Sequence, residues 1–580
     1  MLKRFMQSIR EYKAPSVLTF IFIAGEAVME CFIPLITANL INQIKAGADL
    51  SFVLKTGLLL VGMAIISLSC GGIAGVTCAK ASAGFAKNLR QDVFNRVQSF
   101  SFQNIDKFST SSLVTRMTTD INNVQLSYMM IIRTAIRAPL VLIFSIIMAY
   151  IMGGALATSF VVIIPLLVLG LVLIGKKAMP AFRSVFKKYD RLNESIEENV
   201  RGMRVVKGFA REAHEKQKFA FAAKDICNDF TRAERIVALN APLMQVCVYF
   251  NMAFVLIVGA KLIIENGGSL IGVGEISAML TYGMQIMIQL MMLSMIYVMI
   301  TMSGESMKRI AEVLNEEATL QNPANPVTAV PDGSIDFENV SFKYSAKADR
   351  NALENIQLHI PSGSTVGVIG GTGSGKSTLV QLIPRLYDAT AGTVKVGGID
   401  VRRYDLETLR NAVAMVLQKN VLFSGTIEEN LKWGNEQATE SEMKEACELA
   451  QANEFILGFP AGYQTQIEQD GTNVSGGQKQ RLCIARALLK KPKILILDDS
   501  TSAVDTKTDA AIRAGFKTYI PQTTKIIIAQ RVSSVQEADL ILVLDGGRLS
   551  AAGTHEQLLQ SSKIYREVYE QQQNGGEKND

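Results

Sequence analysis

The sequence contains little of what metal or disulfide chemistry requires. Its 580 residues include seven cysteines and three histidines. The cysteines, at positions 31, 70, 78, 227, 247, 447 and 483, are scattered and form no metal-ligand pairs, which favours reduced or lipid-buried thiols. We assign them no chemistry. The first apolar run also lacks the short apolar core and small-residue cleavage site of a secretory signal, so we expect it to remain in the mature chain.

The first half of the chain is strongly apolar. Hydrophobic residues make up 48% of the sequence and the mean hydropathy is +0.22. Apolar runs close to the ~20 residues that a helix needs to cross a bilayer cover roughly residues 17–38, 54–76, 129–151, 155–175, 241–263 and 278–301. Several of these runs pass directly into polar helical pattern. We therefore predict an all-α transmembrane domain of six spans over residues 1–314, with helices that extend beyond the lipid.

Charge is scarce in alternate connections between these runs. Lysine and arginine gather before the first run and in the second-to-third and fourth-to-fifth connections, whereas Gly153-Gly154 is nearly the whole of one opposite connection. Because positive residues favour the cytoplasmic side, both termini are predicted to be cytoplasmic. This topology explains the net charge of +6 better than nucleic-acid binding would, so membrane lipid is the expected surrounding and no nucleic acid is expected as a partner.

A domain boundary follows the last apolar run. Residues 315–334 contain Pro323, Pro326 and Pro331-Asp332-Gly333, which interrupt any regular pattern, so a linker is predicted there. In residues 335–580, short and nearly all-apolar runs such as 365–369 and 493–497 alternate with helical pattern. Such runs are typical of buried parallel strands, and the second domain is predicted to be α/β.

A phosphate-binding loop follows the first of these strands. Residues 370–377, Gly-Gly-Thr-Gly-Ser-Gly-Lys-Ser, fit the pattern G-x-x-x-x-G-K-S and open a helical run from Thr378 to Tyr387. Glycines allow a tight loop whose amide hydrogens point at phosphate oxygens, and the helix N-terminus adds partial positive charge. Lys376 is expected to reach the β- and γ-phosphates and Ser377 to bind Mg²⁺. The residues predicted to hold the nucleotide here are Gly370, Gly371, Thr372, Gly373, Ser374, Gly375, Lys376, Ser377 and Thr378.

Further motifs carry a resemblance to a known family. Residues 473–481, Asn-Val-Ser-Gly-Gly-Gln-Lys-Gln-Arg, resemble the signature sequence of ATP-binding-cassette (ABC) ATPases. The match extends to Gln418 as the Q-loop, Tyr344 as the aromatic residue that stacks on adenine, Asp498 as the magnesium aspartate, and the D-loop Ser502–Asp505. Residues 108–113 and 198–207 look like the two intracellular loops that dock exporter membrane domains onto the ATPase.

Together these features resemble a half-transporter of the ABC exporter family, six spans fused to one P-loop ATP-binding cassette. The resemblance implies ATP and Mg²⁺ as cofactors, with Ser377, Gln418 and Asp498 at the metal. It also implies that two cassettes close head to tail, each ATP lying between the P-loop of one chain and the signature of the other. The signature residues expected to serve a partner are Ser475, Gly476, Gly477 and Gln478, with Asp505 nearby. Such an exporter works in the cell membrane with the cassette in the cytoplasm.

Two catalytic positions depart from the family. Asp499 stands where the family has the glutamate that polarises the attacking water, and Gln530 stands where it has a histidine that senses the γ-phosphate. The histidines of this chain, at 214, 359 and 555, lie elsewhere. The same departures occur in the degenerate-site subunit of bacterial heterodimeric multidrug exporters, which this chain resembles. A further departure is Gln469, which replaces the glutamate of a motif used for cross-talk with the intracellular loops.

The resulting hypothesis is that this chain holds ATP with little turnover while its signature completes the site of a partner half. Two alternatives stay open. Asp499 is a working base in a homodimeric exporter of lipid or drug, or weakened hydrolysis serves a nucleotide-gated channel or regulator, although no regulatory insertion interrupts the two-domain plan.

Two patterns in the spans concern the cargo. Glu26 and Glu30 lie mid-span, one helical turn apart, and suit either an anionic spot for lipophilic cations or hydrogen bonds to other spans. A methionine stripe suits either a wall that accepts many apolar shapes or helix packing. It comprises Met284, Met287, Met291, Met295, Met299 and Met302. Arg133 and Arg137, near the start of the third span, are expected to reach toward the cytoplasmic interface.

Overall fold

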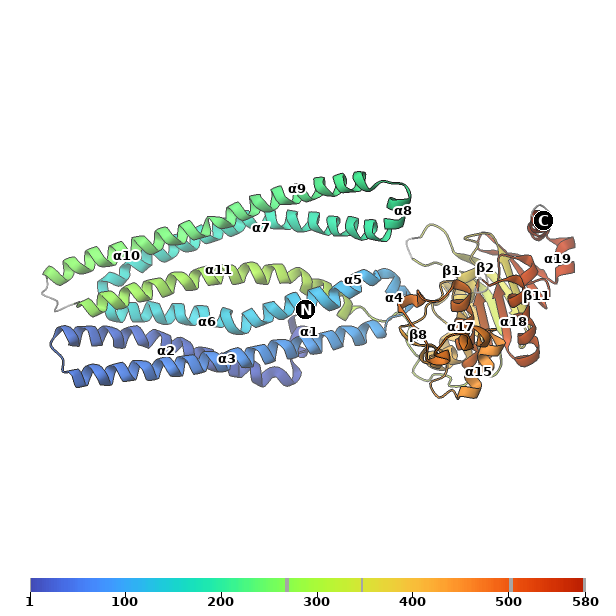
Figure 1. The fold of residues 1–580 in the computed structure, drawn as a ribbon, viewed down its shortest axis with the longest axis horizontal. Coiled ribbons are helices and arrows are strands. Elements are labelled where there is room, and N and C mark those ends of the chain that lie inside the picture. The colour runs from blue at the N-terminus through green and yellow to red at the C-terminus, as the bar shows by residue number, and fades with distance from the viewer. Residues whose placement is uncertain (1, 266–270, 346–347, 500–503, 577–580) are drawn as a thin grey trace. The chain divides into compact units, whose positions relative to one another are not determined.

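The computed structural model describes residues 2–265, 271–345, 348–499 and 504–576 (Figure 1). The chain forms two compact units, one of residues 1–98 and 109–316 and the other of residues 99–108 and 317–580.

The first unit is a bundle of long helices that lie lengthwise beside one another (Figure 1). Its elements are α1 Leu2–Gln7, α2 Lys13–Lys45, α3 Leu50–Gln98, α5 Thr110–Thr115, α6 Ile121–Gly153, α7 Thr158–Arg201, α8 Met203–Gly208, α9 Glu212–Ala238, α10 Asn240–Glu265 and α11 Val273–Asn315. Among the described residues, six helical segments, 25 to 54 residues long, are long and apolar enough to cross a membrane. The six predicted spans are confirmed, and most of these helices exceed the length a bilayer requires.

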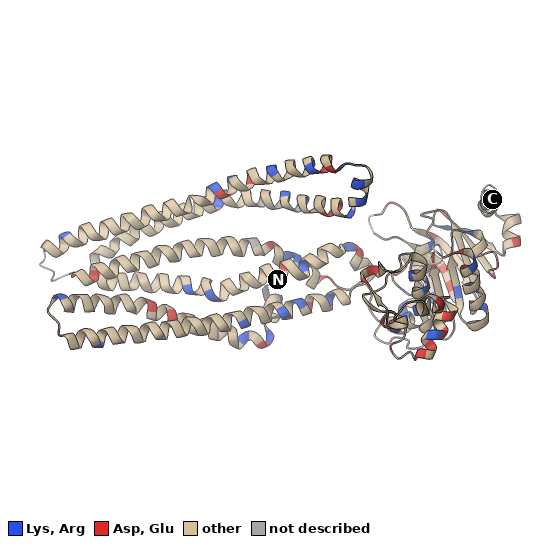
Figure 2. Cartoon of the chain, viewed as in Figure 1, with Lys and Arg blue, Asp and Glu red and all other residues tan. Residues whose placement is uncertain are grey.

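Charge is distributed unevenly over this bundle. Charged residues are sparse along most of each long helix and gather toward one end of the bundle, where α5 and α8 lie (Figure 2). The acidic pair of α2 and the arginines of α6 are exceptions to this pattern. A buried apolar cluster fills the space between α2, α6, α7, α10 and α11, so these helices share one core.

The second unit contains the predicted α/β domain. Its main sheet has the order β12-β11-β3-β10-β9-β6, in which all strands except β12 are parallel. The strands are β3 Thr365–Gly370, β6 Val413–Val416, β9 Ile494–Asp498, β10 Thr524–Ile528, β11 Leu540–Asp545 and β12 Arg548–Gly553. The central strands are buried on both faces, which explains why they read as uninterrupted apolar runs.

A smaller antiparallel sheet has the order β2-β1-β4-β5. Its strands are β1 Ile335–Phe342, β2 Leu353–Ile360, β4 Ala391–Val396 and β5 Ile399–Asp400, and a two-stranded pair joins β7 Gly425–Thr426 to β8 Gln466–Ile467. The helices of the unit are α12 Lys376–Gln381, α13 Leu406–Ala412, α14 Ile427–Lys432, α15 Glu440–Leu449, α16 Asn453–Leu457, α17 Gly476–Leu489, α18 Thr506–Tyr519, α19 His555–Ser561 and α20 Lys563–Gly576. An all-α transmembrane domain fused to an α/β cassette domain is thus confirmed.

A short helix from the first half of the chain belongs to this second unit. Helix α4, Phe102–Lys107, places Asp106 so that its carboxylate accepts a hydrogen bond of 2.7 Å from the Tyr387 hydroxyl. Residues 108–113, which resemble an intracellular docking loop, follow α4 in the chain, and their docking role stays a prediction. The serine-rich run begins α5, with Ser109 as its N-cap, because a serine hydroxyl accepts from the free amide of the first turn.

Candidate functional site

Three chain segments meet at one edge of the main sheet. Strand β10 lies between β3 and β9, and all three run parallel. Their carboxyl ends therefore share one edge, which is where ligands bind in open α/β sheets. The loop that begins at Gly370 follows β3, Asp498 ends β9, and Gln530 follows β10 by two residues. Strand order alone brings the predicted phosphate, metal and switch positions together.

The phosphate loop is a tight backbone turn. Gly373 and Gly375 have φ angles of 78° and 96°, in the left-handed region that glycine adopts at no steric cost. The Lys376 ammonium donates to the carbonyl oxygens of Gly370 and Gly371 at 2.7 and 2.8 Å, so the lysine lies folded across the loop. Burial lowers the pKa of Lys376, against the opposite effect of the carboxylates of Asp498 and Asp499.

One buried hydroxyl in this loop fits an anionic ligand. Ser374 is 4% exposed and its hydroxyl has no hydrogen-bond partner among the described residues. A Cβ placed on Gly371 or Gly373 would meet no protein atom within 4 Å, so the loop is open at these two glycines. Buried polar groups are almost always satisfied, and phosphate oxygens would satisfy this one. Helix α12 is six residues long and ends at Gln381, so the predicted helical run to Tyr387 is too long.

The predicted metal ligands face one another. The Ser377 hydroxyl donates to Asp498 Oδ1 at 3.1 Å, and Asp498 is 3% exposed. Burial raises the pKa of the Asp498 carboxyl and the nearby charge of Asp499 raises it further, whereas Ser377 and Lys376 act in the opposite direction. A hydroxyl and a carboxylate are the hard oxygen donors that Mg²⁺ accepts alongside phosphate oxygens. These residues therefore fit the metal that the family uses.

Tyr344 stands at the margin of the site. Its ring is 44% exposed, and its hydroxyl lies 2.9 Å from Thr378 Oγ1 and donates to Gln381 Oε1 at 3.3 Å. Phe342 and Tyr387 meet this ring edge to face, with centroids 4.9 and 5.2 Å away. Held from one side and open on another, the ring is placed where an adenine base could stack on it.

The two positions that are predicted to depart from the family contact each other. Gln530 Nε2 donates to Asp499 Oδ2 at 2.8 Å, and Gln418 Nε2 lies 3.5 Å from the same oxygen. Asp499 has a φ angle of 49°, a left-handed conformation that aspartate tolerates better than most residues. The Asp499 amide donates to the Ile528 carbonyl at 3.1 Å, which ties the end of β9 to β10. Sequence analysis singled out both residues but did not predict this contact.

The signature residues lie at the start of another helix. Ser475 is the N-cap of α17, its hydroxyl accepts from the Gln478 amide, and Gln478 Oε1 accepts from the Ser475 amide at 2.9 Å. Gly476 and Gly477 form the first turn. Asp505 caps α18 through the Thr508 amide at 2.9 Å, while Ser502 and Ala503 of the predicted D-loop lie outside the described residues. Gln469 begins a short turn ahead of the signature.

The intramembrane glutamates share a cationic partner. Arg137 of α6 donates to Glu30 at 2.6 and 2.8 Å, and its Nε lies 3.5 Å from Glu26 Oε1. The expectation that Arg137 reaches toward the interface is therefore wrong, because two carboxylates of α2 hold it. Sequence analysis missed this pair, although a basic residue in one span and acidic residues in another are a usable indication of an ion pair.

The methionine stripe divides between the bundle core and its surface. Met287 is fully buried in the core of the bundle, whereas Met284 and Met295 are 55% and 60% exposed. Met291 and Met299 are partly buried. The stripe therefore lies along the edge of a packed helix face, which serves packing at Met287 and leaves apolar surface at Met284 and Met295.

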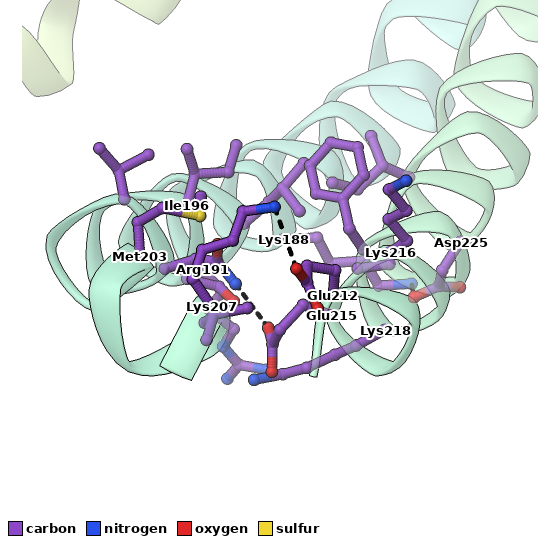
Figure 3. A pocket seen from close by; sticks show the side chains of 18 residues that line it. Lys188, Arg191, Ile196, Met203, Lys207, Glu212, Glu215, Lys216, Lys218 and Asp225 are labelled. Atoms are coloured by element: carbon purple, nitrogen blue, oxygen red, sulfur yellow. Dashed lines mark hydrogen bonds and ion pairs between the residues drawn. The ribbon is translucent and has the colours of Figure 1, made fainter. Parts of the chain in front are cut away.

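An open groove lies between α7, α8 and α9, with a volume of about 820 Å³ (Figure 3). Ile196 and Met203 belong to its apolar wall, and charged side chains such as Lys188 and Lys218 surround it (Figure 3). Ion pairs and hydrogen bonds close parts of the rim, among them Lys207 to Glu212 at 3.0 Å. The groove is thus an apolar surface that the single chain leaves accessible.

Comparison with known proteins agrees with this geometry. The family described as "ABC transporter transmembrane region" matches residues 16–324, and the family described as "ABC transporter" matches residues 353–502. The chain is 35% identical to an uncharacterized ABC transporter ATP-binding protein, YfiB, of Bacillus subtilis over 571 residues, covering 98% of each chain. It is 31% identical to the probable multidrug resistance ABC transporter ATP-binding/permease protein YheI of the same species, covering 99% of this chain and 97% of that one.

A solved structure has the same fold. A bacterial Atm1-family ABC exporter with ATP bound superposes with a TM-score of 0.84 at 24% identity, covering 97% of this chain and 98% of the other. Sequence motifs, fold and relatives thus agree over nearly the whole chain. The chain belongs to the ABC transporter family and is a half-transporter of the exporter type, in which a six-span transmembrane domain is fused to an ATP-binding cassette.

Proposed function

We propose that this chain is the degenerate-site half of a heterodimeric ABC exporter in a bacterial cell membrane, with its cassette in the cytoplasm. The observation that carries the proposal is the hydrogen bond of 2.8 Å between Gln530 and Asp499. The two residues that depart from the family bind each other. The carboxylate at the position that should activate water therefore already accepts a hydrogen bond from a neutral amide.

Nucleotide binding is supported by the intact half of the site. The phosphate loop offers Lys376 and the Ser374 hydroxyl, which has no hydrogen-bond partner among the described residues. Ser377 and Asp498 suit Mg²⁺, and Tyr344 offers a face for adenine. When bound, the metal neutralises charge on the phosphates. Before it binds, Lys376 is held by backbone carbonyls, which keeps its ammonium beside the loop.

Hydrolysis is expected to be slow at this site. Aspartate is one methylene shorter than glutamate, which withdraws the carboxylate by roughly 1.5 Å, and a misplacement near 1 Å can cost ~10²-fold in rate. Gln530 can donate a hydrogen bond but cannot carry a proton, so the site also lacks the acid-base capacity of a histidine. The site is therefore suited to hold ATP more than to split it.

The other face of the cassette is complete. Ser475 caps α17, and the helix N-terminus directs partial positive charge outward. We infer that this signature binds the γ-phosphate of a nucleotide held by the partner half. Hydrolysis there resets an alternating-access cycle in which ATP binding closes the cassettes and turns the membrane cavity outward.

The open groove between α7 and α9 is also suited to bind part of a second half-transporter. Its apolar wall includes Leu192, Ile196 and Phe219, and a soluble surface of this kind is unfavourable unless another element covers it. One half has one cassette and therefore cannot complete a head-to-tail site by itself, which makes the partner half the occupant we propose.

The cargo is proposed to be a small lipophilic compound. Two carboxylates face one guanidinium at Glu26, Glu30 and Arg137, which leaves one negative charge in the bundle when all are ionised. Exposed Met284 and Met295 add soft apolar surface. These features favour cationic compounds, and the resemblance to a probable multidrug resistance protein agrees with drug export.

ATPase turnover of the purified chain in lipid, measured with and without its partner half, tests the proposal. Nucleotide binding with negligible turnover alone, and turnover above ~1 s⁻¹ in the complex, is the expected result. Turnover of that size by the chain alone, abolished by Asp499→Asn, would instead identify a homodimeric exporter in which Asp499 is a working base.

A further inference from the structure

The C-terminal helix reaches the switch segment of the nucleotide site. Gln572 of α20 donates from Nε2 to the Gln530 carbonyl oxygen at 2.8 Å, and its Oε1 accepts from the Val532 amide at 2.8 Å. One side-chain amide thus binds the backbone on both sides of Arg531. The pattern is that of a parallel β-ladder, in which one residue bonds to the carbonyl of the residue before its opposite neighbour and to the amide of the residue after that neighbour.

This segment needs such a partner because regular structure ends there. Strand β10 ends at Ile528, and a short 3-10 turn begins at Val532. The side chain of Arg531, the N-cap of that turn, makes no capping hydrogen bond to it. The first amides of a helical turn have no partner within the turn, so the Val532 amide depends on a group from elsewhere. Gln572 provides it, and with the same side chain it holds the carbonyl of the switch residue.

The position of that backbone controls the side chain at the site. The Gln530 side chain spans from the backbone held by Gln572 to the Asp499 carboxylate, 2.8 Å from its Nε2. A shift of the Gln530 backbone would move its amide relative to Asp499 and to the phosphate loop. We propose that Gln572 is a positioning residue for the γ-phosphate switch, so that the C-terminal helix sets how well this site distinguishes ATP from ADP. The inference rests on the proposed function and on Gln530 sensing the γ-phosphate from the position at which the family has its histidine.

The helix itself is anchored independently of Gln572. The Tyr565 side chain is fully buried and its hydroxyl lies 2.7 Å from His555 Nδ1, and Val568 and Tyr569 pack against the cassette core. Removing the Gln572 amide should therefore leave α20 docked. Gln571 and Gln573 are exposed residues of the same type on the same helix, which makes them matched controls.

The test is photolabelling of the half-transporter complex with 8-azido-ATP, with competition by ATP and by ADP. Gel separation of the two halves reports apparent affinities at this chain's own site. Gln572→Ala is expected to lower the apparent affinity for ATP by about fivefold, equivalent to about 1 kcal/mol, and to leave the apparent affinity for ADP unchanged. Gln572→Glu keeps the acceptor for Val532 but loses the donor to Gln530, so we expect it to weaken ATP as well. Gln571→Ala and Gln573→Ala should match the unmodified chain.

The reference variant Gln530→Ala distinguishes a failure of the positioning role of Gln572 from a failure of the switch role of Gln530. If Gln530→Ala lowers the preference for ATP but Gln572→Ala does not, the positioning role of Gln572 is overturned and the role of Gln530 stands. If Gln530→Ala leaves the preference unchanged, the switch role of Gln530 fails, and this inference fails with it. Equal weakening of ATP and ADP by Gln572→Ala, with a lower unfolding temperature, would show a structural role only and would also overturn the inference.

Discussion

Restoring both catalytic positions should convert this site from one that holds ATP into one that splits it. The double variant Asp499→Glu with Gln530→His returns the two groups that the family uses. Both changes are needed because Asp499 Oδ2 and Gln530 Nε2 lie 2.8 Å apart, so each side chain is sized for the other. A glutamate opposite the unchanged glutamine would carry its carboxylate about 1.5 Å further, too close to an amide that already lies 2.8 Å from the aspartate oxygen.

The expected gain in hydrolysis rate has two sources, the longer reach of the glutamate carboxylate and the ability of histidine to carry a proton. Correcting a misplacement of about 1 Å is worth up to ~10²-fold, and a positioned acid-base group contributes ~10²–10⁴-fold. We expect at least about 100-fold faster hydrolysis in the double variant and less than about 10-fold in either single variant. Asp499 has a left-handed φ of 49°, which glutamate tolerates less well, so part of the gain will be lost to backbone strain.

The assay is single-turnover hydrolysis by the complex with its partner half, in which the partner's own catalytic glutamate is changed to glutamine. Under these conditions the measured hydrolysis comes from the ATP site formed by this chain's own phosphate loop. Asp499→Asn is the matched control and should resemble the unmodified chain. If the double variant is no faster than the unmodified chain, or if Asp499→Asn removes a substantial existing rate, then Asp499 is not a degenerate base and the reasoning fails.

Three further predictions follow from other contacts. Ser475→Ala removes the N-cap of α17, which should cost about 1 kcal/mol of stability and, more informatively, should abolish most ATPase turnover of the complex while nucleotide binding to this chain persists. Arg137→Met leaves two carboxylates of α2 unneutralised and should lower stability by about 1–3 kcal/mol, and changing both carboxylates to glutamine in the same variant should restore it, as thermal unfolding would show. Lys491, which donates to Glu442 at 2.6 Å, is the main cause that holds the pKa of Glu442 at about 2, below its ordinary 4.5; the stabilisation by this pair is therefore complete above pH 4.5 and is lost as the pH falls toward 2, so Glu442→Gln should reduce the fall in unfolding temperature between pH 6 and pH 3, and an unchanged fall would contradict it.

Sequence patterns with a fixed spacing were sufficient to predict much of this molecule. The spans and the α/β sheet follow from local hydrophobic periodicity. The loop at residues 370–377 follows from glycines whose spacing is typical of a phosphate-binding turn. The docking role of residues 108–113 stays a prediction, because their serines also serve as a helix cap and composition does not distinguish the two uses. Helix α12 was predicted too long, since an apolar run continues past Gln381 where the backbone turns away from the helix.

Contacts between distant segments were not predictable in the same way. Arg137 and Glu30 are 107 residues apart, and Gln572 is 42 residues from Gln530. Each residue has an ordinary local role, an arginine near the start of an apolar span or a glutamine in a polar tail, and only the packing of α2 on α6 and of α20 on the cassette gives it a partner. A single sequence carries no record of such pairs.

The unequal state of the two faces of this cassette is itself an argument for a different partner. In a head-to-tail pair of identical chains, both sites would combine the same P-loop with the same signature, so both would contain the Asp499–Gln530 pair. Neither site would then have the glutamate and histidine, and the cycle would lack a fast resetting step. Yet Ser475 and Gln478 form a complete capping box at the start of α17, the geometry in which a signature can meet a γ-phosphate. A complete signature opposite two degenerate sites would have no competent site to serve. We therefore infer that the signature faces a P-loop on a second, non-identical half that retains both catalytic groups.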